Sequence, residues 1–319
     1  MKIRKYNKTF VIIFILFFII GCNNKEENST ATIKKNEITF EWDKEGLKHN
    51  AYVFFVPIKL KGIDKKFKMQ FDLGLNVNVI YEKPLNTILE NYPIYKTNIK
   101  SRKDYSVFIH QLTIGNTPSN IDSLFIYKDY GSPSSIDSLK NIGSIGVNEI
   151  KGKILILDFP KRKLEIVNEI GNENIYNFSN LRVTDRDKLI VSLKFDSKNY
   201  DFLFDTGNGL PIVTTNKTLY NQISENSKEL KDTIRGNSWG EKIELFGSKI
   251  LHNFQIGNNI LLPEHNELIY YTNAKRATAL WKEISHEEGI NLQGGIGLQL
   301  FMDKKIIIDM KNNRFGLEK

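Results

Sequence analysis

Phe204-Asp205-Thr206-Gly207 has a counterpart in Phe71-Asp72-Leu73-Gly74, which lies 133 residues earlier in the chain. An Asp-Thr-Gly tripeptide is by itself a weak signal, because aspartate and glycine meet in many ordinary turns. The same offset also aligns residues upstream of both stretches without a gap, matching Leu193 with Leu60 and Tyr200 with Phe67. This register indicates that one fold occurs twice in the chain.

A second pair of stretches, Gly143-Ser-Ile-Gly146 and Gly294-Gly-Ile-Gly297, repeats at an offset of 151 residues. Each is followed by an apolar run typical of a buried strand, and then by Asp158 or Asp309 at the start of a turn. We interpret these two aspartates as structural, because an aspartate that opens a turn accepts hydrogen bonds from nearby backbone N–H groups. The larger offset predicts an insertion in the second copy, which a helix at Asn273–Glu288 would account for.

Short apolar or alternating runs separated by turn residues fill the chain from Asn50 onward, which predicts a mainly β protein with few short helices. With 319 residues, of which 40% are hydrophobic, the chain can pack two lobes of ordinary size. We predict an N-terminal β lobe at 37–170, an inter-lobe connection at 171–182 and a C-terminal β lobe at 183–319. Besides the helix named above, we predict helices at Pro84–Glu90 and Thr218–Lys231.

The first residues are typical of a lipoprotein signal peptide. Met1–Lys8 is basic, and the apolar run Phe10–Ile20 is shorter than the roughly 20 residues of a spanning helix. Ile19-Ile20-Gly21-Cys22 resembles a bacterial lipobox, which implies a signal peptide at 1–21 and lipidation of Cys22. The alternative is a buried thiol in an uncleaved anchor.

The polar residues 22–36 are predicted to form a flexible tether. Within them, Asn24-Lys25-Glu26-Glu27 is similar to a sorting signal of surface lipoproteins, although a solvated linker explains it equally well. The expected location is therefore the bacterial cell envelope, lipid-anchored, at the outer membrane or cell surface.

Charge argues against nucleic acid as a partner. The formal net charge is +8, but four of the basic residues lie in the predicted leader, and the remainder carries +4. We find no basic stripe with interleaved aromatic residues. The five histidines form no metal-binding spacing, and Cys22 is the only cysteine, so no intrachain disulfide is predicted.

Together, the two loops and the two glycine segments resemble the aspartic proteases, both the bilobal pepsin-like enzymes and the half-sized retropepsins, over roughly Asn50–Lys319. The resemblance implies a bilobal pepsin-like fold built from two duplicated retropepsin-like lobes, and a monomer with pseudo-twofold symmetry. It implies that Asp72 and Asp205 are catalytic, that the substrate is a peptide or protein, and that no metal or organic cofactor is needed. The residues expected to support the active-site loops are Gly74, Thr206, Gly207, Ile145, Gly146, Ile296 and Gly297.

The chemistry needs two aspartates in different protonation states. One ionised carboxylate takes a proton from water, while a protonated carboxyl group polarises the scissile carbonyl. Two like charges held close together resist ionising at once, so such a pair shares a proton and titrates as one unit. The glycine of each loop lets backbone N–H groups approach the carboxylates, which a Cβ would obstruct.

Leu73 departs from the family pattern, in which Thr or Ser at this position donates a hydrogen bond across the pseudo-twofold axis. Thr206 retains its hydroxyl, but leucine offers none in return. Fewer donors near the dyad would raise the pKa values of its carboxyl groups and move activity away from strongly acidic pH. Leu73 also keeps a catalytically silent, peptide-binding or envelope-interaction lipoprotein open as the alternative function. A third alternative, a purely structural lipoprotein, predicts that Asp72 and Asp205 lie far apart.

The flap of the family, a hairpin that closes over substrate, is expected between Ile99 and Ile114, with Tyr105 as the candidate flap residue. Trp239-Gly240 is the candidate hairpin tip of the second lobe. For Tyr105 an ordinary strand residue, and for Trp239 an ordinary core residue, is the alternative interpretation.

Overall fold

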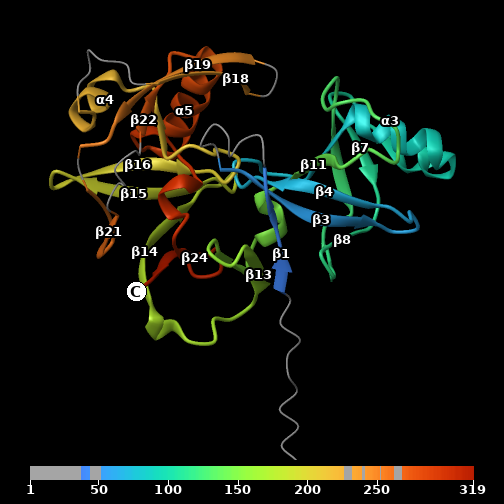
Figure 1. Ribbon diagram of the computed structural model, residues 1–319, viewed down its shortest axis with the longest axis horizontal. Coiled ribbons are helices and arrows are strands. Elements are labelled where there is room, and N and C mark those ends of the chain that lie inside the picture. The colour runs from blue at the N-terminus through green and yellow to red at the C-terminus, as the bar shows by residue number, and fades with distance from the viewer. Residues whose placement is uncertain (1–36, 44–51, 226–231, 239–240, 252, 262–267) are drawn as a thin grey trace, which may run out of the picture. The chain divides into compact units, whose positions relative to one another are not determined.

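The computed structural model describes residues 37–43, 52–225, 232–238, 241–251, 253–261 and 268–319. Two large sheets and a few short helices make up these residues (Figure 1). The predicted fold class, mainly β with two duplicated lobes and few short helices, is confirmed. The predicted signal peptide, the tether and Cys22 lie outside the described residues.

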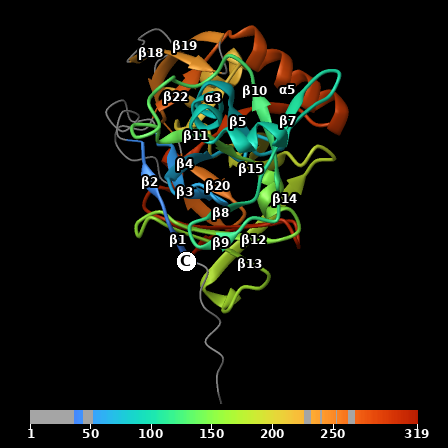
Figure 2. The ribbon, with the colours of Figure 1, turned by 90° about the vertical axis from the view of Figure 1, so that its right-hand side faces the viewer.

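The first lobe is one ten-stranded sheet, in the order β6-β7-β10-β5-β11-β4-β3-β8-β9 with β2 beside β3. Figure 2 brings this sheet and its helix α3 toward the viewer. Its strands are β2 Glu41–Trp42, β3 Phe54–Leu60, β4 Lys66–Phe71, β5 Val79–Tyr81, β6 Ile99–Ser101, β7 Ser106–Ile109, β8 Leu112–Ile114, β9 Thr117–Pro118, β10 Ser123–Tyr127 and β11 Asn141–Ile145.

The second sheet contains the strands of the second lobe and continues into six strands drawn from both halves of the chain. The second-lobe strands are β15 Leu189–Phe195, β16 Lys198–Phe204, β17 Ile212–Thr214, β18 Asp232–Ser238, β19 Glu241–Lys249, β20 Phe254–Ile256, β21 Asn259–Leu261, β22 Leu268–Tyr271 and β23 Leu292–Ile296. The six further strands are β1 Glu37–Thr39, β12 Ile154–Asp158, β13 Lys163–Val167, β14 Tyr176–Val183, β24 Lys305–Asp309 and β25 Arg314–Glu318.

The duplication predicted from the two offsets is visible in the strand pairing. In the first lobe β4 runs parallel to β11, β5 runs antiparallel to β11, and β10 runs parallel to β5. In the second lobe β16, β23, β17 and β22 repeat the same three pairings. Both sequence registers therefore correspond to equivalent strands.

The six shared strands follow the order β1-β13-β12-β24-β25-β14, so equivalent strands lie on either side of the β12–β24 pair. A pseudo-twofold axis therefore passes between β12 and β24. The predicted inter-lobe connection at 171–182 contains most of β14, which pairs with β25 as β1 pairs with β13. Its polar residues gave no strand periodicity, because this strand is held by backbone pairing at a partly exposed position.

Helices are few in the described ranges. They are α3 Glu82–Asn91, α4 Lys217–Ile223 and α5 Lys275–Glu288, with the 3-10 helices η1 Pro93–Asn98, η2 Val147–Ile150, η3 Glu173–Ile175 and η4 Leu298–Phe301. Helix α5 ends as predicted at Gly289, whose φ of 62° is left-handed. The prediction of a helix to Lys231 was wrong. Helix α4 ends at Ile223, because the next residue, Ser224, forms a β-bridge with Ile250.

Aromatic side chains fill the core behind each repeated loop. Phe71 stacks on Phe54 with 5.6 Å between ring centroids, and Phe204 packs edge-on against Phe301 and Phe315. All five are buried, and they belong to one hydrophobic core that spans both lobes. Both loops are therefore held from behind by the same rigid core.

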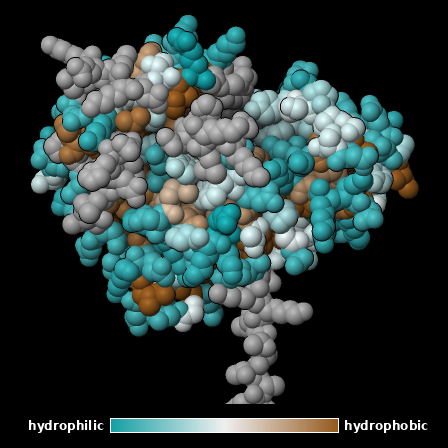
Figure 3. All heavy atoms as spheres, viewed as in Figure 1, coloured by the Kyte–Doolittle hydropathy of each residue, from teal (hydrophilic) through white to brown (hydrophobic). Residues whose placement is uncertain are grey.

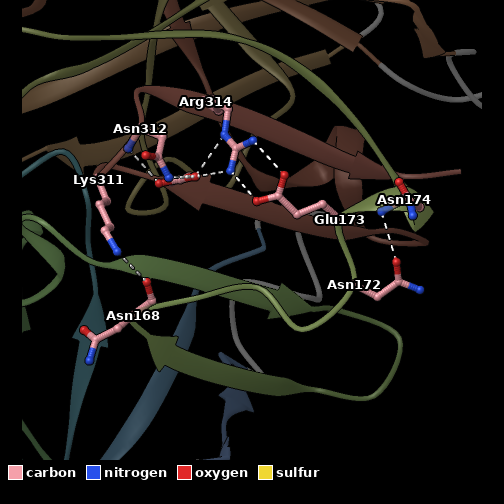
Figure 4. A network of polar contacts seen from close by, with 8 residues as sticks. Asn168, Asn172, Glu173, Asn174, Lys311, Asn312 and Arg314 are labelled. Atoms are coloured by element: carbon pink, nitrogen blue, oxygen red, sulfur yellow. Dashed lines mark hydrogen bonds and ion pairs between the residues drawn. The ribbon is translucent and has the colours of Figure 1, made fainter.

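Asp158 and Asp309 are structural, as predicted. Their carboxylates accept hydrogen bonds from the backbone N–H groups of Lys161 and Asn312, at 3.0 and 2.8 Å. In the second lobe Arg314 also bonds the fully buried Asp309 and reaches Glu173, and Figure 4 shows the guanidinium directed toward the carboxylate of Glu173. These contacts fix the turns of the shared sheet.

Residues Asn36–Lys319 form one compact unit. On the face shown in Figure 3, hydrophobic side chains occur in small separate groups within a largely hydrophilic surface. Among the residues that the structure describes, no helix has the length and apolar character needed to cross a membrane.

Candidate active site

Asp72 and Asp205 occupy equivalent positions, each directly after a strand that ends in phenylalanine. The backbone N–H of Asp72 donates to Ile145 at 2.9 Å, and that of Asp205 donates to Ile296 at 3.0 Å. In both loops the aspartate carbonyl accepts a bond of 3.1 Å from the residue three positions on. The two aspartates are therefore presented by the same local backbone structure.

The predicted supporting segments lie behind these loops. The N–H of Val147, which follows Gly146, donates to the carbonyl of Leu75. The N–H of Leu298, which follows Gly297, donates to the carbonyl of Asn208. A Cβ on Gly146 would overlap the carbonyl of Val77, and a Cβ on Gly297 would overlap the carbonyl of Asn208. Only glycine permits this close approach of two backbone segments.

The two carboxyl groups meet across the lobes. The N–H of Gly74 lies 3.1 Å from Oδ1 of Asp72 and also 3.1 Å from Oδ1 of Asp205. The N–H of Gly207 donates to Oδ1 of Asp205 at 2.7 Å. The N–H of Gly74 therefore bridges the carboxyl groups of Asp72 and Asp205. The structure thus brings together the two residues that the sequence nominated.

Each carboxyl group also packs over the loop glycine of the opposite lobe. A Cβ on Gly74 would lie 2.5 to 2.6 Å from three carboxyl atoms of Asp205, and a Cβ on Gly207 would lie 2.5 to 2.7 Å from those of Asp72. Distances below 3.0 Å cannot be accommodated without movement of one partner. The glycines therefore set how closely the aspartates approach.

Asp72 is 5% exposed, whereas Asp205 is partly exposed. Burial raises the pKa of Asp72 well above its ordinary value, and the nearby charge and hydrogen bond of Asp205 raise it further. The N–H of Gly74 and the charge of Lys188 act in the opposite direction. The direction agrees with the prediction from sequence, although burial is the first cause.

The donors around the dyad are unequal. Among the described residues, Asp205 accepts hydrogen bonds from two backbone N–H groups and Asp72 accepts one. N–H donors stabilise the ionised form of a carboxyl group, and Asp72 has the fewer of them.

Thr206 bridges the lobes from the fully buried centre of the site. Its hydroxyl donates to the carbonyl of Phe71 at 2.7 Å and accepts from the N–H of Leu73 at 2.9 Å. The side chain of Leu73 is fully buried in the core and offers no hydroxyl in return. The crossed linkage predicted for the family is thus present in one direction.

Lys188 was missed by the sequence reasoning. Its Nζ donates to the carbonyl oxygen of Gly74. The charges of Asp205 and Asp72 both act to raise the pKa of Lys188. In the sequence it belongs to a charged turn, Asp185-Arg186-Asp187-Lys188, which is typical of a solvated hairpin. The turn has no apolar periodicity, so the sequence does not distinguish a lysine that points into the protein from one that points into solvent.

An aromatic cluster lies beside Asp72 in the first lobe, and sequence reasoning missed it too. Tyr130 packs edge-on against Tyr81 and Tyr127, with centroid distances of 4.8 and 5.2 Å. The hydroxyl of Tyr81 bonds that of Ser144 at 2.8 Å. The charge of Asp72 contributes to the raised pKa values of Tyr81 and Tyr130, after the larger effect of burial.

Tyr105 lies in the turn between β6 and β7, which is the hairpin expected for the flap. It is 46% exposed, and its ring lies 5.1 Å from that of Phe125. In the second lobe β18 and β19 pair as a hairpin, and the candidate tip Trp239-Gly240 lies outside the described residues.

Two cavities of about 440 Å³ lie in the second half, and neither is lined by an aspartate of the dyad. In the described ranges no group of three or more His, Cys, Asp or Glu side chains is arranged to hold a metal ion.

No family model matches the chain, and no curated protein matches it by sequence. Among solved structures, the chain is similar to the crystal structure of the aspartic proteinase from Irpex lacteus. That likeness has a TM-score of 0.45 and 10% sequence identity, and it covers 89% of this chain and 96% of the Irpex protein.

Proposed function

We propose that this protein is an aspartic endopeptidase that hydrolyses peptide bonds with the Asp72–Asp205 pair. The observation that carries the proposal is the meeting of two carboxyl groups, one from each lobe, over the glycines of the opposite loops. This geometry contradicts the purely structural alternative, which predicted separated aspartates.

The chemistry follows from the asymmetry of the pair. Asp205, the ionised partner, takes a proton from a water molecule as its oxygen attacks the scissile carbonyl carbon. Asp72, the protonated partner, gives its proton to the carbonyl oxygen, which yields a neutral tetrahedral diol. Asp205 then passes its proton to the leaving nitrogen and Asp72 recovers a proton from the diol, so the C–N bond breaks and the dyad returns to its starting state.

The aromatic cluster of Tyr81, Tyr127 and Tyr130 supports a peptide with an apolar or aromatic side chain next to the cleaved bond. Tyr127 and Tyr130 are partly exposed, so each presents an apolar ring with a polar tip, and the charge of Asp72 acts on Tyr130.

We place the enzyme at the bacterial cell envelope, outside the cytoplasm, held by lipid on Cys22. The support is the basic and apolar leader followed by Ile19-Ile20-Gly21-Cys22. Metabolic labelling with a radioactive fatty acid would test the anchor, because Cys22→Ser should abolish incorporation of the label.

Cleavage of an unbiased peptide library, read by mass spectrometry, tests the activity. We expect Asp205→Asn to abolish cleavage, because the ionised partner is lost. Asp196→Asn is the matched control. Asp196 is exposed in a turn with a φ of 44°, a conformation that asparagine also accepts, so this variant should cleave normally. Equal cleavage by Asp205→Asn and the wild type would refute the proposal.

Leu73 favours the second candidate, a silent peptide-binding protein with the same fold. The two candidates differ in one result. A protein that binds library peptides but leaves them intact across pH 3 to 9 would be the silent form, and Asp205→Asn would then bind them as well as the wild type.

A further inference from the structure

Lys188 lies immediately before β15, at the end of the turn that follows β14. The turn is well fixed, because the N–H of Thr184 donates to the carbonyl of Lys188 at 2.9 Å and the Thr184 hydroxyl accepts from the N–H of Lys188 at 2.9 Å. From this position the half-buried side chain crosses to the first lobe and donates to the carbonyl of Gly74. Gly74 is the residue whose N–H group bonds both aspartates.

The charges that face Lys188 come from three places. Asp72 follows β4, Asp205 follows β16, and Arg186 belongs to the same turn as Lys188. Arg186 is engaged by Glu283 and Glu287 of α5, and Asp187 by Lys151 of the first lobe. Tyr81 and Tyr130, on which the charge of Asp72 acts, have raised pKa values and are neutral at physiological pH. Lys188 is therefore the cation that acts on the dyad among the described side chains.

We propose that Lys188 is a positioning residue that ties the first active-site loop to the second lobe and sets the pH range in which the dyad holds one proton. The inference rests on the proposed function. It adds to that function a hydrogen bond from Lys188 of the second lobe to Gly74 of the first. This bond lies in a site where Leu73 lacks the hydroxyl that would donate a bond across the lobes.

The sign of the effect follows from charge. A nearby cation stabilises ionised carboxylates, so Lys188 lowers both apparent pKa values of the pair. Burial of Asp72 and repulsion between the aspartates act in the opposite direction. The singly protonated, reactive pair exists between the two apparent pKa values. Removing the charge of Lys188 should therefore move the whole reactive range to higher pH.

The burial of the Lys188 ammonium group also argues for a role beyond stabilising the fold. Burial lowers its pKa despite the attraction of both aspartates, so desolvation outweighs that attraction. A lysine that only supported the fold would be more stable at the surface.

The test is a pH titration of the aspartate carboxyl carbons by NMR in the full-length protein, with the resonances assigned through Asp72→Asn and Asp205→Asn. For Lys188→Met we expect both midpoints of the pair to rise by about one pH unit, the low end of the effect of one nearby opposite charge. Lys188→Arg keeps the charge and should titrate near the wild type. Lys194→Met is the matched control, because Lys194 is exposed on β15, six residues and about 20 Å beyond Lys188.

Lys188→Gln separates the charge from the hydrogen bond, because its amide still donates to the Gly74 carbonyl. In Lys188→Gln the midpoints of the aspartate pair should rise as they do in Lys188→Met. If Lys188→Met fails to fold, Lys188→Gln is compared with the wild type instead. Unchanged midpoints in either folded neutral variant would overturn the proposal.

Cleavage kinetics separate this inference from the proposed function. If peptides are cleaved, the pH profile of kcat should shift upward in Lys188→Met while KM stays unchanged, since Lys188 is not placed against substrate. An unshifted profile would refute the role of Lys188 and leave the peptidase intact. If no peptide is cleaved but the NMR midpoints rise, the peptidase fails and the role of Lys188 in the dyad stands.

Discussion

Replacing Thr206 with valine tests whether the cross-lobe hydroxyl organises the dyad. Valine keeps the shape of threonine and removes only the hydroxyl, which is fully buried and bonded to Phe71 and Leu73 at 2.7 and 2.9 Å. Two buried backbone groups lose this partner, at about 1–3 kcal/mol each, so we expect the free energy of unfolding to fall by about 2–6 kcal/mol. Urea denaturation measures the loss.

Thr214→Val is the matched control for this substitution. The hydroxyl of Thr214 is also fully buried, donates to the carbonyl of Gln293 at 2.5 Å and accepts from the N–H of Asn216 at 2.9 Å. These bonds lie within the second lobe, so Thr214→Val should lose similar stability and keep its catalytic rate. Only Thr206→Val should lower kcat, by about tenfold or more, because a small displacement of the dyad is costly. The reasoning fails if the two variants lose equal activity, or if Thr206→Val is as stable as the wild type.

Three further predictions concern the same site. Gly207→Ala places a Cβ within 2.5 to 2.7 Å of the Asp72 carboxyl atoms and should lower single-turnover cleavage by about 100-fold, whereas Gly171→Ala, where nothing lies within 4 Å, should have no effect. Asp72→Asn should raise the Tm at pH 7. The folded-state pKa of Asp72 is raised, so stability falls as pH rises from the ordinary pKa of 3.8 to the raised value and stays lower above it, and scans below 3.8 should show no gain. Leu73→Thr removes a fully buried apolar side chain and should cost about 1–3 kcal/mol, yet raise kcat by returning a hydroxyl to the first loop; a stable variant with unchanged kcat would show that Leu73 does not limit the dyad.

The ungapped repeat paired Asp72 with Asp205, and the resemblance to the aspartic proteases implied that their carboxyl groups meet. Residues at equivalent positions of two copies are related by the pseudo-twofold axis, so those nearest the axis approach each other. The same resemblance implied that Ile145 and Ile296 support the loops, and their carbonyls accept the N–H groups of the two aspartates. No knowledge of side-chain packing was needed for these inferences.

The structural features that sequence reasoning missed are those that break the repeat. Lys188 aligns with Phe55 at the offset of the loops, so the repeat itself predicts nothing polar there. Its contact with Gly74 depends on the path of one side chain between lobes, which spacing does not encode. Tyr81 was visible only as the end of an apolar strand, and its hydroxyl bond to Ser144 requires the register of β5 against β11.

The departures from symmetry share one direction. Thr206 and Lys188, the two side chains that tie the loops together, both belong to the second lobe, and both bind backbone of the first loop. The first loop therefore depends on the second lobe for its position, while the first lobe supplies the buried aspartate and the aromatic cluster beside it. A pair of carboxyl groups in identical surroundings would have no preference for which one holds the shared proton. Here the greater burial of Asp72 and the second N–H donor to Asp205 set that preference, so the loss of symmetry at Leu73 is compatible with an acid and a base in distinct roles.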